Sequence, residues 1–343
     1  MATKKTPQAK GRKADSDTPK TLQAAIRYFA DPDTCLKYAQ KLRWPGGVAC
    51  PTCGRQDVRF LATRRLWECK AKHPKRQFSA KIGTLMEDSA IGLDKWFPAM
   101  WMLANCKNGI SSYELGRGLG VTQKTAWFML QRIRLAMQAP EGGKIGGGGK
   151  VVEADETFIG GKARSMNAKQ RRKAKADGIE LGPYAYTNRA LVYAMLERGG
   201  RVRAMQVRDR ERKTLLGAMT KHVERGSEVH TDELASYSGI GSRYYEHKVI
   251  NHGVQYVDGT VHTNNVENFW NLLKRTLRGT YVSVEPFHLF RYLDEQAFRF
   301  NERKHEEGDA GRFVETAKGV VGKRLTYKKL IGADQVLHPA ILH

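Results

Sequence analysis

The sequence predicts an α/β protein in which a domain built on a mixed β-sheet follows two smaller N-terminal elements. Three observations lead to this prediction: a cluster of cysteines near the N-terminus, helical periodicity after it, and a second half whose strand-like segments end in acidic residues. The chain has 343 residues, which is enough for roughly two or three domains and at least one sizeable core.

Net charge is the first indication of a partner. The chain carries 59 Lys and Arg against 35 Asp and Glu, a formal net charge of +24. Such an excess favours a polyanion, above all a nucleic acid, because neutralised phosphates release their condensed counterions. An anionic membrane or ribosomal RNA would fit the charge as well. No stretch approaches the roughly 18 apolar residues of a membrane span, and the N-terminus lacks the apolar part of a signal peptide, so we expect a cytoplasmic protein.

A cysteine cluster lies in residues 21–90, after a basic arm at 1–20 that is predicted to be disordered and a helix predicted at 22–42. Cys50 and Cys53 are three positions apart, as in a zinc knuckle, and Cys69 and His73 complete a tetrahedral set of three thiolates and one imidazole. The spacing therefore predicts a zinc ribbon with a structural Zn²⁺. The alternative is that these are ordinary reduced cysteines and that His73 is a solvated surface residue. The remaining cysteines are expected in the core: Cys35 and Cys106.

Residues 91–140 have the pattern of a helix-turn-helix. Ser111 or Ser112 can cap a first helix, the glycines at 118–120 supply the turn, and Thr122 can cap a second helix. A recognition helix meets base edges and phosphates with its first residues. The residues expected to contact DNA are therefore Gln123, Lys124 and Thr125. The alternative is a plain helical hairpin.

A glycine-rich segment at 141–150 is predicted to be a flexible linker and is the clearest domain boundary. Beyond it, residues 151–305 alternate between strand and helix patterns, as in a mixed sheet covered by helices. Strands are predicted at 151–159, 189–196, 201–207, 227–231 and 244–250, and helices at 213–224 and 263–277. Residues 306–343 are predicted to form a basic tail.

Two acids stand on or at the end of predicted strands in this domain. Asp155 lies on the first strand and Asp232 ends the fourth, which is the layout of a ribonuclease H-like core that holds metal ions. The third ligand is expected on a helix that Thr263 can cap, where Asn264 and Glu267 share one face. Lys274, two turns after Glu267, could meet a phosphate. The adjacent acids are expected to point to the other side of their strands: Glu156 and Glu233.

These motifs resemble those of a known family. Three segments are similar to the three catalytic blocks of bacterial DDE-type insertion-sequence transposases: DETFIGGK, HTDELASY and HTNNVENFWNLLKRTLRGTY. They resemble most the branch that has an N-terminal zinc ribbon and an N-x-x-E third block. The N-terminal segments CPTCG and GISSYELGRGLGVTQKTAWFMLQRIR match as well. One departure is the pairing of Cys69 with His73, where two cysteines are commoner.

The resemblance implies a transposase that binds the terminal inverted repeats of its element and catalyses metal-dependent cleavage and strand transfer. It implies two Mg²⁺ or Mn²⁺ ions, with Asp155 between them, Asp232 on one and Glu267 on the other. Whether Glu267 or Asn264 completes the site stays open, with Glu267 favoured. The implied partners are double-stranded DNA and a second copy of the chain in the active complex.

Basic residues outside the acidic blocks would hold phosphates. They lie in the insertion after the first strand, which is otherwise a solvated charge cluster, and on the third-block helix: Lys169, Arg171, Arg172, Arg275 and Arg278. Two rival functions remain at this point. The first is a non-catalytic DNA-binding regulator built on the ribbon and the helix-turn-helix. The second is a structure-specific nuclease of the same core that cleaves without strand transfer.

Overall fold

The computed structural model describes residues 18–140, 142–160, 168–176, 189–239, 244–250 and 261–333. The chain divides into two compact units. The first comprises residues 1–105 and 304–322, and the second comprises residues 106–303 and 323–343. No helix of the described chain combines the length and the apolar character that crossing a membrane requires.

The first unit joins a small antiparallel sheet, in the order β1-β2-β3, to a group of helices. Its elements are α1 (Leu22–Tyr28), α2 (Pro32–Arg43), β1 (Val58–Leu61), β2 (Leu66–Cys69), β3 (Gln77–Phe78), α3 (Leu93–Asn105) and α10 (Gly308–Lys318). The helices pack through an aromatic cluster of Phe29, Tyr38, Phe97 and Phe313. Under the sheet, Trp67 packs against Trp44 and Phe78.

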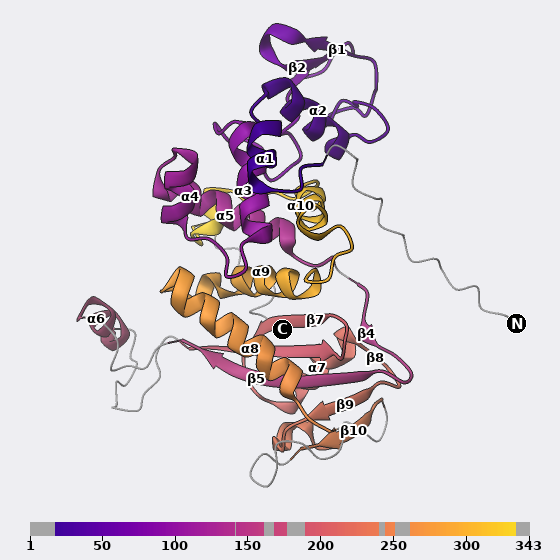
Figure 1. Ribbon diagram of the computed structural model, residues 1–343, viewed down its shortest axis with the longest axis vertical. Helices are drawn as coiled ribbons and strands as arrows, with labels where there is room; N and C mark the ends of the chain where they lie inside the picture. The colour runs from indigo at the N-terminus through magenta and orange to yellow at the C-terminus, as the bar shows by residue number, and fades with distance from the viewer. Residues whose placement is uncertain are drawn as a thin grey trace, which may run out of the picture. The chain divides into compact units, whose positions relative to one another are not determined.

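The second unit is built on a mixed five-stranded sheet in the order β10-β9-β5-β6-β7 (Figure 1). The long strand β5 pairs antiparallel with β6 and parallel with β9, and β9 pairs parallel with β10. The strands are β4 (Ile145–Gly146), β5 (Val151–Ile159), β6 (Ala190–Glu197), β7 (Val202–Val207), β8 (Val223–Glu224), β9 (Glu228–Thr231) and β10 (Glu246–Val249). The helices are α4 (Ser112–Leu119), α5 (Gln123–Met137), α6 (Ala168–Ala176), α7 (Arg212–His222), α8 (Asn264–Thr276), α9 (Leu289–Asn301) and α11 (Tyr327–Leu330).

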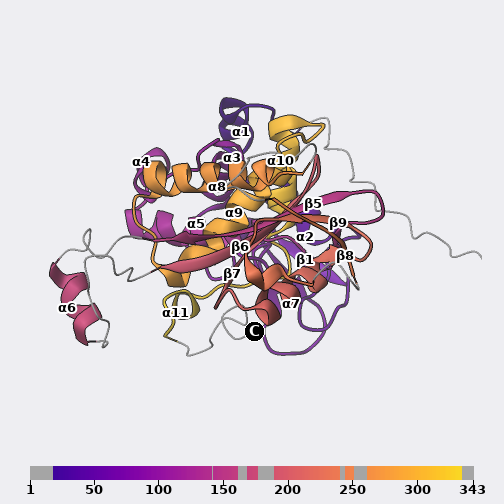
Figure 2. The same ribbon diagram turned by 90° about the horizontal axis from the view of Figure 1, so that it is seen from below.

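Helices cover both faces of this sheet (Figure 2). On one face, Leu215 and Met219 of α7 pack with Val152 and Ala154 of β5. On the other face, α8 and α9 pack on alternate residues of β6, and the core there includes Val192, Ala194, Val266, Phe269, Leu273, Leu289 and Leu293. Strands buried on both sides are expected for a sheet between two helical layers. The predicted mixed α/β architecture of this part of the chain is confirmed.

Helices α4 and α5 form a capped hairpin within the second unit. Ser111 and Glu114 make a capping box at the start of α4, and the Thr122 hydroxyl accepts from the Thr125 N–H at the start of α5. Between them Gly120 has a left-handed conformation, φ 62°, which favours glycine. A buried ion pair between Arg134 Nε and Glu295 Oε2, 2.7 Å long, joins α5 to α9.

The structure differs from the predicted elements in three places. The helix predicted at 22–42 is two helices, because Asp31 caps a new helix with Pro32 in its first turn. The predicted glycine-rich linker contains β4, which pairs with β8 and buries Ile145 in the core. The predicted basic tail contains α10, whose Phe313 is fully buried in the aromatic core of the first unit. The predicted basic arm falls outside the described residues, except for 18–20.

Candidate active site

The strand register puts the two predicted catalytic aspartates level with each other. In the parallel pair of β5 and β9, Glu153 is opposite His230. Two positions further along both strands stand Asp155 and Asp232, the latter directly after the last residue of β9. Neighbouring strands are about 4.8 Å apart, so two carboxylates at this register lie close enough to share bound cations.

Asp155 lies in an environment that disfavours its negative charge. The carboxyl is largely buried, and burial together with the charges of Glu156 and Asp232 raises the pKa of Asp155 to about 7. The Trp270 indole donates to Asp155 Oδ2 at 2.9 Å, which partly opposes this effect. A cation beside these acids would relieve the repulsion between them.

Helix α8 lies along the face of β5 that presents Asp155 (Figure 1). Its contacts follow the helix stripe of Thr263, Glu267, Trp270 and Lys274, which are four, three and four positions apart. The Thr263 hydroxyl donates to Glu267 Oε1 at 3.1 Å, and Lys274 Nζ donates to the Thr157 hydroxyl at 2.9 Å. Glu267 thus lies on the stripe of α8 that faces Asp155.

The three acids do not form a closed ligand set in this structure. Among the described residues, one group of three or more potential metal ligands has its ligand atoms all within 4.8 Å of one another. That group consists of cysteines and a histidine of the first unit and does not include the three acids. Asn264 is exposed, and half-buried Glu267 stands one turn further along α8. Glu267 shares its stripe of α8 with Trp270, which contacts Asp155.

Thr263 does not cap α8, contrary to the sequence prediction. Its side chain makes no capping hydrogen bond, because it donates to Glu267 instead. The cap comes from β5: Glu153 Oε2 accepts from the N–H groups of Asn265 at 2.8 Å and Val266 at 3.1 Å. Sequence reasoning missed Glu153, although an acid between the apolar residues Val152 and Ala154, two positions before Asp155, was a usable signal.

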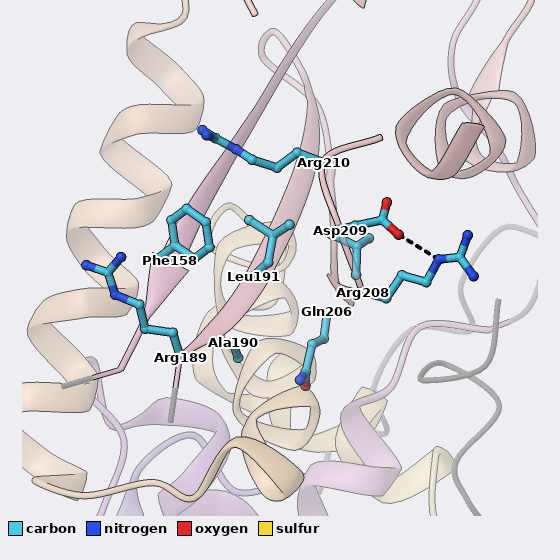
Figure 3. Close-up of a pocket in the computed structure, with 9 residues that line it drawn as sticks. Phe158, Arg189, Ala190, Leu191, Gln206, Arg208, Asp209 and Arg210 are labelled. Carbon is cyan, nitrogen blue, oxygen red and sulfur yellow. Dashed lines mark ion pairs between the residues drawn. The ribbon is translucent and has the colours of Figure 1, made fainter. Parts of the chain in front are cut away.

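The opposite face of β5 carries a different cluster. Glu156 points away from α8, as predicted, and accepts from Arg210 at 2.8 and 2.9 Å and from the Tyr237 hydroxyl at 2.7 Å. The predicted counterpart, Glu233, is exposed. Nearby is an open pocket of about 360 Å³ at half-exposed Phe158. Figure 3 shows Arg189 and Arg210 beside this ring, at 5.1 and 5.4 Å from its centroid.

The outer side of α8 is basic and polar. Arg275 and Arg278 are exposed, and with Lys274 they border an open groove of about 610 Å³. The remaining lining residues are uncharged: Asn268, Asn271 and Gly279. No carboxylate borders the groove among the described residues, so its positive charge is available to phosphates.

The residues predicted to read DNA open α5. Gln123 and Lys124 are exposed, and Thr125 is half-buried. Gln123 Nε2 donates to the Ser112 hydroxyl at 2.8 Å, Lys124 Nζ lies 5.0 Å from the Tyr327 ring centroid, and the Thr125 hydroxyl contacts Thr122. In the basic insertion, α6 carries exposed Arg171 and Arg172, whereas the side chain of Lys169 lies outside the described residues.

The predicted zinc ligands meet in the first unit. The ligand atoms of Cys50, Cys53, Cys69 and His73 all lie within 4.8 Å of one another. Zn–S bonds of about 2.3 Å and Zn–N bonds of about 2.1 Å give tetrahedral edges of about 3.8 Å between sulfurs and about 3.6 Å between sulfur and nitrogen. The observed separations are 3.6 Å between the Cys53 and Cys69 sulfurs and 3.4 Å from Cys50 Sγ to His73 Nε2.

The surroundings of this cluster favour metal binding. Burial raises the pKa of the Cys50 thiol, but the N–H groups of Cys53 and Thr52 act in the opposite direction. The net effect lowers the pKa of Cys50 to about 7. His73 Nδ1 lies 2.6 Å from the Pro74 carbonyl oxygen, and a proton on Nδ1 that is donated there leaves Nε2 free to bind a metal. The cluster fits a structural Zn²⁺, and the predicted zinc ribbon is confirmed.

Comparison with known protein families matches two segments of the chain. Residues 30–71 match the transposase zinc-ribbon domain, and residues 146–301 match the ISXO2-like transposase domain. Together the matches cover more than half of the chain, with three of the four zinc ligands in the first and all three acids in the second.

A relative from Halobacterium salinarum is described as an uncharacterized protein in transposable element ISH50. It is 25% identical over 259 residues, which cover 74% of this chain and 85% of that protein. The order of a zinc ribbon followed by a transposase domain agrees with the resemblance seen in the sequence motifs. The chain belongs to the insertion-sequence transposases that combine a transposase zinc ribbon with an ISXO2-like transposase domain.

Proposed function

We propose that this chain binds the terminal inverted repeats of its insertion sequence, cleaves DNA there and joins the freed 3′ end to target DNA. The main support is the register of β5 and β9, which sets Asp232 level with Asp155 on the side of the sheet that α8 covers. Because strands fix the backbone more firmly than loops, an acid on β5 and an acid directly after β9 provide a defined cation site.

Asp155, Asp232 and Glu267 are the residues that would hold two Mg²⁺ or Mn²⁺ ions. The donors fit, because these ions prefer carboxylate oxygens and because the charges that raise the pKa of Asp155 are those a cation neutralises. When bound, such a metal pair activates the attacking oxygen and stabilises charge on the phosphoryl group. We favour Glu267 over Asn264 as the third ligand, since the Thr263 hydroxyl holds its carboxylate on the inner stripe of α8.

Other residues of the chain would orient the acids and the DNA. The Trp270 indole donates to Asp155 Oδ2 and thereby fixes the orientation of this carboxylate. The Lys274 amine, held by Thr157 on the same strand as Asp155, is suited to bind the phosphate under attack. Arg275 on the outer side of α8 and Arg278, in the turn directly after this helix, would bind neighbouring phosphates.

The fold supports this function. Three antiparallel strands followed by two parallel ones, with acids on the first and the fourth, agree with a ribonuclease H-like core. The capped α4–α5 hairpin agrees with a helix-turn-helix whose first recognition residues are Gln123 and Lys124. Two element ends must be processed together, so we expect at least a homodimer in the active complex.

The proposal is tested with a duplex that carries the element's own ends, incubated with Mg²⁺ or Mn²⁺. Wild type should nick the duplex and transfer a pre-cleaved 3′ end. Asp155→Ala, Asp232→Ala and Glu267→Ala should lose at least about a thousandfold in both steps yet still bind DNA. Glu233→Ala, which removes the exposed acid beside Asp232, is the matched control and should stay active.

The outcomes separate the rival functions. Cleavage without strand transfer would indicate a nuclease. DNA binding without either reaction, and without an effect of the three substitutions, would indicate a regulator.

A further inference from the structure

Glu153 is a fully buried carboxylate beside the candidate active site. It lies on β5, two positions before Asp155 and on the same side of the strand, and its exposed surface is 0%. From the part of the chain that the structure describes it accepts four hydrogen bonds, all from groups outside β5. Oε2 accepts from the Asn265 and Val266 N–H groups, and Oε1 accepts from Asn265 Nδ2 and from Arg198 Nε, both at 2.7 Å.

This bonding leaves Glu153 no capacity to act as a metal ligand. A carboxylate has about four acceptor positions, and all four are used here. The hydrogen bonds instead satisfy the start of α8, whose first N–H groups would otherwise be unpaired because Thr263 does not cap them. The negative charge of Glu153 also matches the positive end of the helix dipole.

A second contact fixes the segment that leads into α8. Arg198, directly after β6, donates from one guanidinium nitrogen to the carbonyl oxygen of His262 at 2.9 Å and also contacts His230 Nδ1 at 3.0 Å. The N–H group of His262 donates to the same imidazole nitrogen at 3.4 Å. At the start of the helix, Glu153 therefore binds backbone N–H groups, and Arg198 binds a backbone carbonyl oxygen.

The contacts along β5 and α8 have matching spacing. Glu153, Asp155 and Thr157 contact Asn265, Trp270 and Lys274 in that order. Four residues of strand span about 13 Å, and nine residues of helix span about 13.5 Å. The three contacts therefore fix how far α8 is shifted along β5 and how it is rotated.

We propose that Glu153 is a positioning residue that fixes the start of α8 on β5 and so sets Glu267 against Asp155 and Asp232. This inference rests on the proposed function, because it assigns Glu153 its role through those three ligands. Glu267 is in the first turn of α8, two residues after Asn265, so a loosened start of the helix displaces Glu267 before any other active-site residue.

Metal binding without DNA tests this role, with the melting temperature followed as Mn²⁺ is added. Glu153→Gln keeps the shape of the side chain but turns one acceptor into a donor that faces N–H groups. We expect the Mn²⁺ concentration for half of the stabilisation to rise at least tenfold. The control is Leu215→Ala on α7, a destabilising change in the core on the other face of the sheet, which should leave that concentration unchanged.

A milder pair of variants keeps the test valid if Glu153→Gln does not fold. Asn265→Ala removes one side-chain hydrogen bond to Glu153 from an exposed position, and we expect a roughly threefold rise in the half-saturating Mn²⁺ concentration. Asn271→Ala, an exposed asparagine of the same helix without that bond, should show no rise.

Two outcomes would overturn the inference in distinguishable ways. If wild type responds to Mn²⁺ and both Glu153→Gln and Asn265→Ala keep the wild-type half-saturation, Glu153 is only a structural residue and the proposed function stands. If wild type neither binds Mn²⁺ nor cleaves DNA, the proposed function fails and this inference fails with it.

Discussion

Replacing Asp155 by asparagine should stabilise the metal-free protein at neutral and higher pH, although it should abolish catalysis. Burial, Glu156 and Asp232 together raise the pKa of Asp155 to about 7, so the folded state bears an electrostatic cost when this carboxyl ionises. Asparagine has nearly the same shape and keeps an oxygen that can accept the Trp270 N–H. The substitution therefore removes the cost and little else.

The size and the pH window of the effect follow from the pKa. The carboxyl ionises near 3.8 in the unfolded chain and near 7 in the folded one. The difference is worth about 4 kcal/mol at most. Between these values the folded state holds the extra proton, so wild-type stability falls as the pH rises from about 4 to about 7. With allowance for partial hydration, we expect Asp155→Asn to be more stable by about 2 to 4 kcal/mol at pH 8 and equal at pH 4.

The assay is urea unfolding at pH 4 and at pH 8, in buffer without Mg²⁺ or Mn²⁺ but with the zinc retained. Glu233→Gln, which neutralises the exposed acid beside Asp232, is the control and should match wild type at both pH values. Equal stability of Asp155→Asn and wild type at pH 8 would refute the reasoning. So would a difference that persists unchanged at pH 4.

Three further predictions concern other parts of the chain. His73→Ala should lose the one zinc ion per chain that His73→Cys retains, as measured by a colorimetric zinc assay; full zinc content in the alanine variant would exclude His73 as a ligand. Lys124→Ala should weaken DNA binding about equally for all sequences and lower the salt dependence by about one phosphate contact, as measured by DNA affinity at several salt concentrations. Unchanged affinity and salt dependence would contradict a contact between α5 and DNA. Burial, followed by the charges of Lys221 and Arg203, lowers the pKa of His222 to about 4, so the folded protein loses stability as the pH falls from about 6.5 to about 4. His222→Gln should flatten the pH dependence of the unfolding free energy over this range. His222 is only half-buried, so we expect about 1 to 2 kcal/mol, and an unchanged profile would contradict this assignment.

The features that the sequence predicted correctly depend on residues that are close together in the chain. Cys50 and Cys53 lie within one knuckle, and Thr122 caps the helix that begins at the next residue, so both were recognisable from a few adjacent positions. Asp155 and Asp232 stand out because acids are unusual on or directly after apolar strands. Each of these features depends on residue type and short spacing.

The unpredicted features depend on contacts between distant segments. Glu153 caps a helix that begins more than a hundred positions later, and Thr263 loses its expected capping role because Glu267 takes its hydroxyl. Ile145 was assigned to a flexible linker, yet β4 pairs with β8 and buries it. No short-range pattern contains these partners, so only the folded arrangement reveals them.

The central claim is that Asp155, Asp232 and Glu267 bind the same divalent ions. The most direct measurement exchanges each acid for cysteine and compares strand cleavage in Mg²⁺ and in Mn²⁺, because a thiolate is a poor ligand for Mg²⁺ and a better one for Mn²⁺. We predict that each cysteine variant is inactive with Mg²⁺ and regains cleavage with Mn²⁺, whereas the alanine variants stay inactive with both ions. If Mn²⁺ restores none of the cysteine variants, or restores the alanine variants equally, these acids do not bind the catalytic metal.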